Sequence, residues 1–309
     1  MSQGVAGLGE PRGPAAVHPT AERIGAAAGA KASGENFPVA LRLLPARYRR
    51  HLQAVYGYAR AVDDMGDEAP PGQRARLLDD LEADLGRLYR FQGTDPAGPG
   101  RPGEPPRLGV VRALAPVVAE CGVPRQAFVD LIQANRQDQV VSRYATFADL
   151  AGYCELSANP VGRIVLHVFG AVTPDRLILS DRVCTALQLA EHWQDVAEDL
   201  RSGRIYLPGE DLARFGVSVD DLADPTASPQ VRALMAFEVR RARELLDQGA
   251  PLVGNLRGAA RVAVAGYVAG GRAALAAIAG AGHDVLRATP KPRRGRLVRE
   301  VLTAYAAGR

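Results

Sequence analysis

The sequence predicts an all-α protein, and its composition carries that prediction. Ala, Leu and Arg, which are good helix formers, dominate the chain. Val and Ile are scattered along it rather than gathered into the alternating runs of half-buried strands. Apolar residues make up 47% of the 309 residues, which is enough for a sizeable core. We therefore expect one helical domain over residues 34–309, after a Gly-, Ala- and Pro-rich tail over residues 1–33 that we expect to be disordered.

Helix-start signals divide the expected domain into segments. Thr173 and Ser228 are each followed by proline, a pair that suits an N-cap and the first helical position. Thr146 can cap a further helix, and Asp149 would favour the positive end of that helix. The Pro- and Gly-rich stretch from Gly93 to Arg107 indicates an exposed loop. The sequence therefore predicts helices over residues 45–67, 73–91, 108–120, 124–139, 146–169, 173–201, 228–248, 255–281 and 294–307.

Net charge and cysteine content limit the classes of binding partner and the cellular compartments that we expect. The net charge of +4 suits an anionic substrate or membrane surface, and no basic tract interleaved with aromatics indicates nucleic acid. The three cysteines show no CxxC spacing, and no apolar signal region opens the chain. We expect a cytoplasmic protein, with peripheral contact at the inner face of the membrane as an open alternative. The apolar stretch from Val262 to Gly282 is interrupted by Arg272 and predicts a core helix rather than a membrane span.

An acidic run near the first long helix is the first candidate for chemistry. On a helix, Asp63 and Asp67 lie one turn apart, and Asp64 lies three residues before Asp67. Carboxylates at that spacing repel one another unless a cation lies between them, and Mg²⁺ commonly bridges such carboxylates to a substrate phosphate. An isolated acidic run is usually a solvated helix end. Here an apolar stripe from Leu52 to Val62 leads into Asp63, which favours a metal site on a buried face.

A second acidic cluster lies on the helix that Thr173 opens. Glu191, Asp195 and Asp199 are spaced i, i+4, i+8 and stack along one face, which Leu187 extends with apolar surface. Either cluster alone is weak evidence, but two clusters on separate helices support each other. We expect a single bundle with a central cavity, in which the two clusters hold several Mg²⁺ ions around a diphosphate.

Two arginines accompany these clusters. Arg60 lies one turn before the first cluster, where it can either pair with a carboxylate or grip a diphosphate with two hydrogen bonds. Arg204 and Tyr206 directly follow the second cluster. We expect the segment from Gly203 to Pro208 to fold back as a flap that brings Arg204 to the leaving group.

Taken together and in order, six segments resemble the squalene/phytoene synthase family. They are NFPVA at 36–40, LLP at 43–45, the RxxDDxxD run from Arg60, SANPVGR at 157–163, WQDVAED at 193–199 and GRIYLP at 203–208. The resemblance covers about residues 33–290. It implies an all-α isoprenoid-synthase fold, Mg²⁺, and head-to-head prenyl diphosphate chemistry through a cyclopropylcarbinyl diphosphate. Within the family, the NFPVA and WQD segments are most similar to the hydroxysqualene synthases of bacterial hopanoid biosynthesis, which ionise presqualene diphosphate and let water capture the cation.

The resemblance implies a role for each candidate by its position. The metal candidates are Asp63, Asp67, Asp195 and Asp199, with Asp64 and Glu191 beside them. The first catalytic candidates are Tyr56 and Arg60 at the diphosphate end and Tyr153 along the cavity. The substrate-binding candidates are Val161, Leu187, Gln188 and Tyr267. The remaining catalytic candidates are Gln194, Arg204 and Tyr206. The faces of Tyr56 and Tyr153 would stabilise the cation, although ordinary core packing is an equal alternative for either residue.

Two positions depart from the family pattern. Glu191 stands where Asn is usual, which adds negative charge near the diphosphate. Gln194 stands where condensing enzymes usually have Arg, so we expect water capture rather than condensation, with Gln188, Gln194 or a tyrosine hydroxyl placing the water. We interpret His192 and Trp193 as packing residues.

The partner implied is presqualene diphosphate, handed over by a presqualene diphosphate synthase. The alternatives are a squalene or phytoene synthase and, ranked low, a non-catalytic assembly factor, which should have lost the carboxylates.

Overall fold

The computed structural model describes residues 20–25, 44–94, 104–292, 300–301 and 303–306. Nearly all regular structure among these residues is helical, and none of them forms a strand, so the all-α prediction is confirmed. The elements are α3 (Ala46–Asp63), η1 (Asp64–Glu68), α4 (Pro71–Phe91), α5 (Gly109–Ala113), α6 (Ala115–Cys121), α7 (Arg125–Gln137), α8 (Phe147–Ser157), α9 (Asn159–Val168), α10 (Pro174–Gln194), α11 (Val196–Arg201), α12 (Gly209–Phe215), η2 (Asp220–Ala223), α13 (Pro229–Gly249), α14 (Leu252–Asn255) and α15 (Gly258–Gly280).

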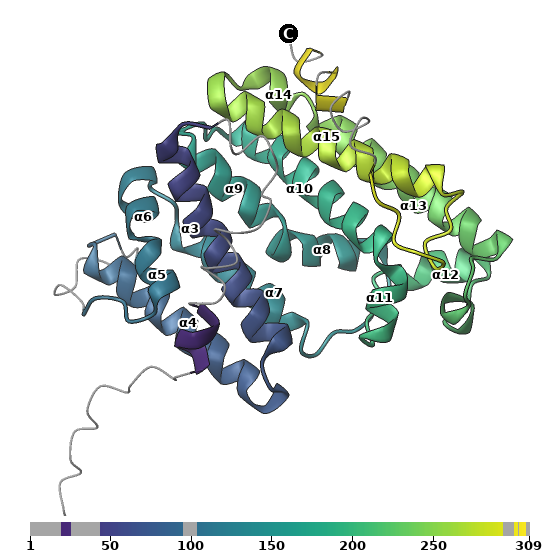
Figure 1. Ribbon diagram of the computed structural model, residues 1–309, viewed down its shortest axis with the longest axis horizontal. Coiled ribbons are helices and arrows are strands. Elements are labelled where there is room, and N and C mark those ends of the chain that lie inside the picture. Colours follow the sequence, from purple (N-terminus) through teal and green to yellow (C-terminus); the bar gives the residue numbers. More distant parts are fainter. Residues whose placement is uncertain (1–19, 26–43, 95–103, 293–299, 302, 307–309) are drawn as a thin grey trace, which may run out of the picture.

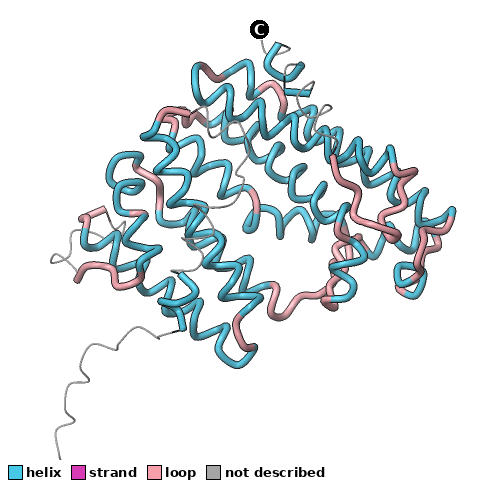
Figure 2. Tube along the Cα trace, viewed as in Figure 1, coloured by secondary structure: helices cyan, strands magenta, loops and turns pink. Residues whose placement is uncertain are grey.

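The helices form two packed groups that meet along α9 and α10. Helices α3 to α7 lie on one side in Figure 1, and α13 to α15 lie on the other. Figure 2 shows that loops occupy mainly the ends of this bundle. Each group has its own hydrophobic cluster, and Tyr267 of α15 packs against both. The face of the bundle between the two groups is therefore the place where side chains from α3 and from α10 meet.

The first long helix changes its geometry at the acidic run. Pro45, which the sequence predicts as the first helical residue, is the N-cap of α3, so the helix begins one position later at Ala46. After Asp63 the helix widens into the π-helical turn η1, where the Ala69 amide donates to the Asp64 carbonyl; such turns are frequent at functional sites. A Cβ atom on Gly66 would lie 2.2 Å from Asn135 Oδ1, so the missing side chain lets α7 approach this turn closely.

Three predicted helices are each broken into two. The segment predicted over 146–169 breaks at Ala158, and the segment predicted over 108–120 breaks at Leu114. In both cases a proline follows within two residues, at the start of the next helix, where its ring and missing N–H disrupt the preceding turn. The segment predicted over 173–201 breaks at Asp195, which ends α10 and caps α11.

The predicted caps are confirmed. The Thr146 hydroxyl accepts the Asp149 N–H at 3.1 Å while the Asp149 carboxylate accepts the Thr146 N–H at 2.9 Å, which is a capping box. The Thr173 hydroxyl accepts the N–H of Arg176, and the Ser228 hydroxyl accepts the N–H of Val231, each at 3.3 Å. Local signals therefore fixed these three helix starts.

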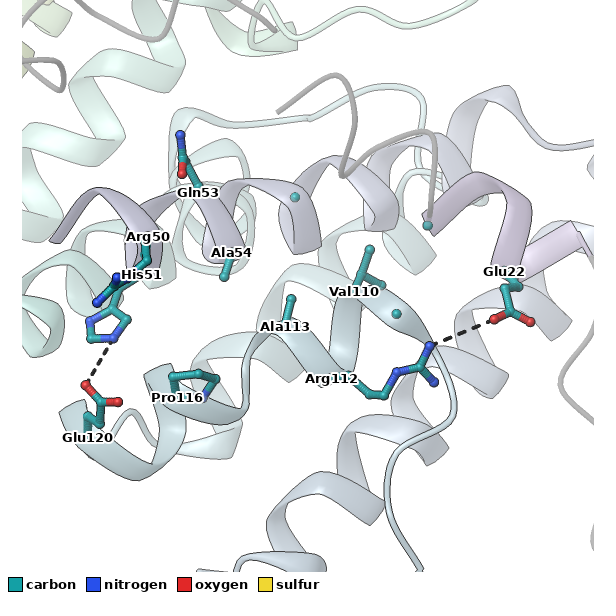
Figure 3. Close-up of a pocket in the computed structure, with 13 residues that line it drawn as sticks. Glu22, Arg50, His51, Gln53, Ala54, Val110, Arg112, Ala113, Pro116 and Glu120 are labelled. Atoms are coloured by element: carbon teal, nitrogen blue, oxygen red, sulfur yellow. Dashed lines mark ion pairs between the residues drawn. The ribbon is translucent and has the colours of Figure 1, made fainter. Parts of the chain in front are cut away.

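The prediction of a disordered tail over residues 1–33 is wrong at residues 20–25. These residues are helical, and Ala21 is fully buried in the cluster of the first group. Figure 3 shows this turn beside a pocket of about 820 Å³ between α3 and α5–α6, with the ion pairs Glu22–Arg112 and His51–Glu120 at its two ends. The rest of the predicted tail, most of the predicted loop at 93–107 and part of the helix predicted at 294–307 lie outside the described residues.

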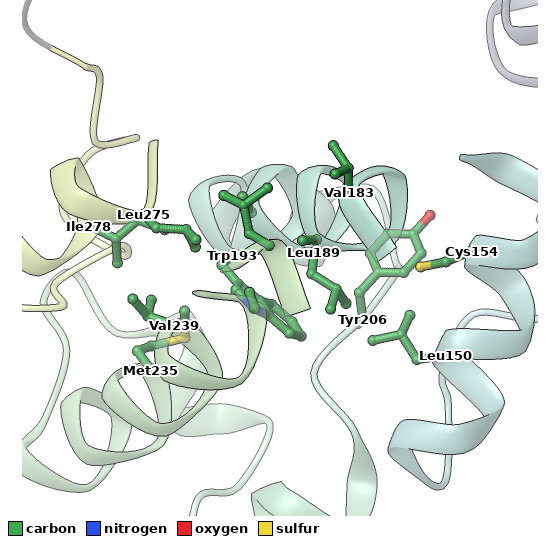
Figure 4. Packing of buried hydrophobic residues seen from close by; sticks show 14 of the residues in the cluster. Leu150, Cys154, Val183, Leu189, Trp193, Tyr206, Met235, Val239, Leu275 and Ile278 are labelled. Carbon is green, nitrogen blue, oxygen red and sulfur yellow. The ribbon is translucent and has the colours of Figure 1, made fainter. Parts of the chain in front are cut away.

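Helix α10 packs against α13 and α15 around Trp193, which is fully buried (Figure 4). The packing interpretation of Trp193 is therefore confirmed. A Cβ atom on Gly249 of α13 would lie 2.8 Å from the Leu179 carbonyl oxygen, so glycine allows the two helices to pack closely. Helix α15 is long and apolar enough to cross a membrane, and 56% of its most apolar window is buried in this core, as the sequence predicts for a core helix.

Candidate active site

A pocket of about 310 Å³ lies where the two helical groups meet. Helices α3, α7, α8, α9 and α10 contribute to its wall, together with the segment after α11. Its lining residues are Ala59, Asp63, Asp67, Leu131, Ala134, Asn135, Asp138, Tyr153, Ser157, Val161, Gln188, Glu191, His192, Asp195, Asp199, Arg204 and Tyr206. The structure thus brings both predicted acidic clusters into one cavity.

The first cluster contributes two carboxylates, and each is held by a residue of another segment. Asn135 of α7 donates to Asp63 Oδ1 at 3.2 Å. Arg204 forms an ion pair with Asp67, with Arg204 Nη1 3.4 Å from Asp67 Oδ2. Asp63 and Asp67 both keep solvent contact through the pocket. Asp63 and Asp67 are therefore oriented by their neighbours and still face the pocket.

The second cluster contributes Glu191, Asp195 and Asp199 across a change of helix direction. The sequence predicts that the three residues share one continuous helix. Asp195, however, has φ −105° and ψ 15°, and the helix is interrupted there. The Asp199 amide donates to the Asp195 carbonyl at 2.8 Å, and the α11 turn keeps both side chains on the pocket. The break changes the spacing of the carboxylates but not the cavity that they face.

Negative charge dominates the pocket. Among its described lining residues there are six carboxylates and one guanidinium, that of Arg204. Desolvation, reinforced by neighbouring carboxylates, raises the pKa of Asp63 to about 6 and that of Asp199 to about 7. Burial and the nearby Asp195 likewise raise the pKa of Glu191. The site therefore favours the arrival of additional positive charge.

The donor set fits Mg²⁺ carried with a diphosphate. All of these ligand atoms are hard carboxylate oxygens, as Mg²⁺ requires. Within the described part of the chain, no three His, Cys, Asp or Glu side chains are arranged to hold one ion by themselves. Mg²⁺ typically takes one or two carboxylates and completes its shell with water and substrate phosphates.

An aromatic wall lies beside the carboxylates. The rings of His192 and Tyr206 stack with centroids 3.7 Å apart, and Tyr153 lies 5.8 Å from Tyr206. Burial, together with Arg204, lowers the pKa of His192 to about 3, so its imidazole is neutral. His192 is packed, as the sequence predicts, but it also lines the pocket.

The segment from Gly203 to Pro208 is not a free flap. The Ile205 amide donates to the Ser142 carbonyl at 2.8 Å, and the Gly209 amide donates to the Tyr144 carbonyl at 2.9 Å. The side chain of Ile205 is buried, and Tyr206 beside it packs into the same cluster. Arg204 reaches the pocket because this segment is fixed along residues 142–145.

Arg60 and Asp64 belong together, away from the pocket lining. Arg60 Nε lies 2.8 Å from Asp64 Oδ1, and Arg60 Nη2 lies 2.9 Å from Glu68 Oε1. Asp64 is 4% exposed, so its carboxylate is engaged in this pair rather than presented to the cavity. Tyr56 also lies near Arg60 and outside the lining. The carboxylate-pairing alternative for Arg60 is correct, and the metal assignment of Asp64 is not supported.

Three more candidates lie outside the pocket lining. The Gln194 amide donates to the carbonyl of Pro290, so Gln194 does not place a water in this cavity. Leu187 packs in the core beside Gly271. Tyr267 is enclosed between the two hydrophobic clusters, where burial raises its pKa to about 12. By contrast Tyr153, Val161, Gln188, Arg204 and Tyr206 do line the pocket.

Sequence reasoning missed Asn135 and Asp138 of the α7 segment. Asn135 holds Asp63, and Asp138 accepts a hydrogen bond from the Tyr153 hydroxyl at 2.7 Å. Their spacing of three residues on a helix would place both on one face, which is the signal available beforehand. Without a partner cluster in view, that signal is indistinguishable from an ordinary polar helix end.

Comparison with known proteins decides the family. The family model for squalene/phytoene synthase matches residues 30–296. The chain belongs to the squalene/phytoene synthase family. It is 35% identical to a hydroxysqualene synthase of Rhodopseudomonas palustris, over 72% of each chain, and 31% identical to a phytoene synthase of Mycobacterium tuberculosis, over 73% of this chain and 71% of that one.

Solved structures of the family agree with the fold. Squalene synthase HpnC from Alicyclobacillus acidocaldarius superposes with a TM-score of 0.73 at 39% identity, covering 85% of this chain and 95% of that one. A dehydrosqualene synthase in complex with a ligand superposes with a TM-score of 0.76 at 25% identity, covering 93% and 97%. The chain therefore has the isoprenoid-synthase helical fold that the resemblance implies.

Proposed function

We propose that the protein converts presqualene diphosphate to hydroxysqualene in a Mg²⁺-dependent reaction. The observation that carries the proposal is that two carboxylate clusters and an aromatic wall line one shared pocket. One side of that pocket suits a metal-bound diphosphate, and the other suits a carbocation. The hydroxysqualene synthases at 35% and 32% identity favour this substrate among the diphosphates of the family.

The diphosphate end would be held by the carboxylates through Mg²⁺. Asp63 and Asp67 would bind it from α3 and η1, and Glu191, Asp195 and Asp199 from α10 and α11. Bound Mg²⁺ neutralises the diphosphate and makes it a better leaving group. Arg204 pairs with Asp67 at the same edge, which supports a role in which its guanidinium would contact the diphosphate oxygens.

The cation end would be formed by the aromatic wall and the apolar residues beside it. When the C–O bond breaks, its electron pair leaves with the diphosphate and the hydrocarbon carries the positive charge. The faces of Tyr153 and Tyr206 stabilise that charge, and Val161 and Leu131 provide apolar surface. His192 remains neutral, so it adds no repulsion toward the cation.

The described pocket lining holds one arginine rather than two, and we take this to favour water capture over condensation. Gln194 stands at the position where the condensing enzymes of the family usually carry arginine, and its amide is directed to Pro290. Among the described lining residues, Arg204 is then the one arginine available to a diphosphate. A squalene or phytoene synthase is the alternative, supported by the phytoene synthases at 31% identity.

Substrate comparison tests the proposal. Purified protein with Mg²⁺ is given presqualene diphosphate, farnesyl diphosphate or geranylgeranyl diphosphate in separate reactions, and the extracted products are identified by mass spectrometry. We expect hydroxysqualene from presqualene diphosphate alone. Efficient consumption of either linear diphosphate would instead establish a condensing enzyme.

In a cell the substrate would come from a presqualene diphosphate synthase. We propose a cytoplasmic location, with contact at the membrane during transfer.

A further inference from the structure

The polar contact between α7 and α8 has no role in the steps above. Asp138 caps the C-terminal end of α7, and Tyr153 lies in the middle of α8. The Tyr153 hydroxyl donates to Asp138 Oδ2 at 2.7 Å, and both residues line the pocket. Asp138 Oδ1 is buried and, within the described residues, accepts no hydrogen bond. The Tyr153 hydroxyl is therefore the hydrogen-bond donor that this carboxylate has.

The charge on Asp138 makes this hydrogen bond directional. A hydroxyl bonded to a carboxylate acts as the donor, because an ionised carboxylate can only accept. The hydroxyl proton of Tyr153 is then committed to Asp138, and the lone pairs of its oxygen remain available on the other side. Hydrogen bonds in such chains strengthen one another, so the phenol oxygen becomes a better acceptor.

Tyr206 and Arg204 lie beside this contact. The ring of Tyr206 is 5.8 Å from that of Tyr153. Arg204 lies near Asp138, which favours the ionised carboxylate even though burial raises its pKa to about 6. Asp138 thus holds the hydroxyl of Tyr153 at the aromatic wall, beside Tyr206.

We propose that Asp138 is a positioning residue for water capture. By holding the Tyr153 proton, it makes the phenol oxygen accept an O–H bond of the capturing water, which leaves a lone pair of that water free to attack the cation. In the attack a C–O bond forms from the water lone pair and one O–H bond breaks. The released proton goes to the departed diphosphate, which carries the electron pair of the broken C–O bond. This inference rests on the proposed function and names the group that orients its second reactant.

The alternative orientation explains the expected effect. Without Asp138, the Tyr153 hydroxyl is free to rotate and donate its proton to the water oxygen. That contact occupies the lone pair that attacks the cation. The cation would then lose a proton to give an unsaturated hydrocarbon more often than it does in the wild type. Loss of Asp138 should therefore change the ratio of alcohol to hydrocarbon, and not the rate alone.

A product-ratio experiment on the full chain tests this role. Wild type, Asp138→Asn, Asp138→Ala, Tyr153→Phe and the Asp138→Ala/Tyr153→Phe double variant are given presqualene diphosphate with Mg²⁺. Asp130→Asn, a change of charge on the same helix outside the pocket, is the matched control. We expect Asp138→Ala to lower the alcohol-to-hydrocarbon ratio about tenfold, the size of one lost charge-assisted contact, and Asp138→Asn to lower it less because its amide oxygen can still accept.

The double variant separates positioning from general damage. If Asp138 acts through Tyr153, adding Asp138→Ala to Tyr153→Phe changes the ratio no further. A merely structural Asp138 would reduce yield or stability in every background with the ratio unchanged, and that result overturns the proposal. A wild type that forms no alcohol at all overturns the proposed function and this role with it. A wild type that forms alcohol with a ratio insensitive to Asp138→Ala overturns the role alone.

Discussion

Arg204 pairs with Asp67 across 137 positions of sequence and joins the end of the second acidic cluster to the first. Arg204 is the sole guanidinium among the described residues that line the pocket. The Asp67 side chain is 43% exposed, so the pair contributes little to folding stability. Its value lies in placing a positive charge where the diphosphate is expected to bind.

Replacing Arg204 should therefore impair substrate use more than folding. We expect Arg204→Gln to lower kcat/KM by about a hundredfold, which is the scale of a lost charged hydrogen bond in a pocket, while the melting temperature changes little. Arg201→Gln, an exposed neighbour, is the control and should behave as wild type. Steady-state kinetics and thermal melts measure the two effects. Equal kinetics for both variants would remove Arg204 from the site.

The two metal clusters should be separately essential for turnover. We expect Asp63→Ala or Asp195→Ala to reduce turnover by at least about a hundredfold, because each would remove a ligand of the Mg²⁺ that we propose to bind the diphosphate. Without metal, melting temperatures should stay unchanged or rise, since a repelling carboxylate is gone. Glu198→Ala, an exposed acid on α11, is the control. Full activity in either cluster variant would contradict the metal assignment.

Stability without metal should fall as the pH rises. Burial and neighbouring charge raise the pKa of Asp63 to about 6 and that of Asp199 to about 7, above the ordinary value of 3.8. A raised folded-state pKa gives stability that is present below about pH 4 and is lost as the pH rises through 6 and 7. We expect the melting temperature of Asp199→Asn to exceed that of wild type by a margin that grows between pH 5 and pH 8. A margin independent of pH would show that Asp199 is not perturbed.

The close approach of α7 to the acidic turn should depend on Gly66. A Cβ atom there would lie 2.2 Å from Asn135 Oδ1, so Gly66→Ala must displace the side chain that holds Asp63. We expect it to destabilise the fold by about 1–3 kcal/mol, as overpacking does, and to lower activity. Gly152→Ala is the matched control, because nothing lies within 4 Å of the added methyl group. Denaturant unfolding that ranks Gly66→Ala as neutral would contradict this packing.

The sequence predicted elements whose signals are local. The capping box at Thr146 and the proline-marked starts at Thr173 and Ser228 require only neighbouring residues, and all three are present. Helix breaks were harder, because a proline two residues into a helix can be read either as a start or as an interruption. The break before Pro160 shows that ambiguity, and the buried turn at residues 20–25 depends on contacts with distant helices.

The sequence predicted those site residues whose helical spacing decides which face of the helix they lie on. Asp63 and Asp67 share a face and line the pocket, whereas Asp64 is rotated toward Arg60. Gln194 could not be placed from sequence, because its partner Pro290 lies 96 positions away. Asp138 was missed for the same reason, since only the packing of α7 against α8 brings it to Tyr153.

The most direct test of the central claim is the source of oxygen in the product. The protein is incubated with presqualene diphosphate and Mg²⁺ in ¹⁸O-labelled water, with and without NADPH, and the product is analysed by mass spectrometry. Our account predicts hydroxysqualene that carries the solvent label in full and a yield that NADPH does not change. Squalene as the main product, or an alcohol without the label, would contradict it.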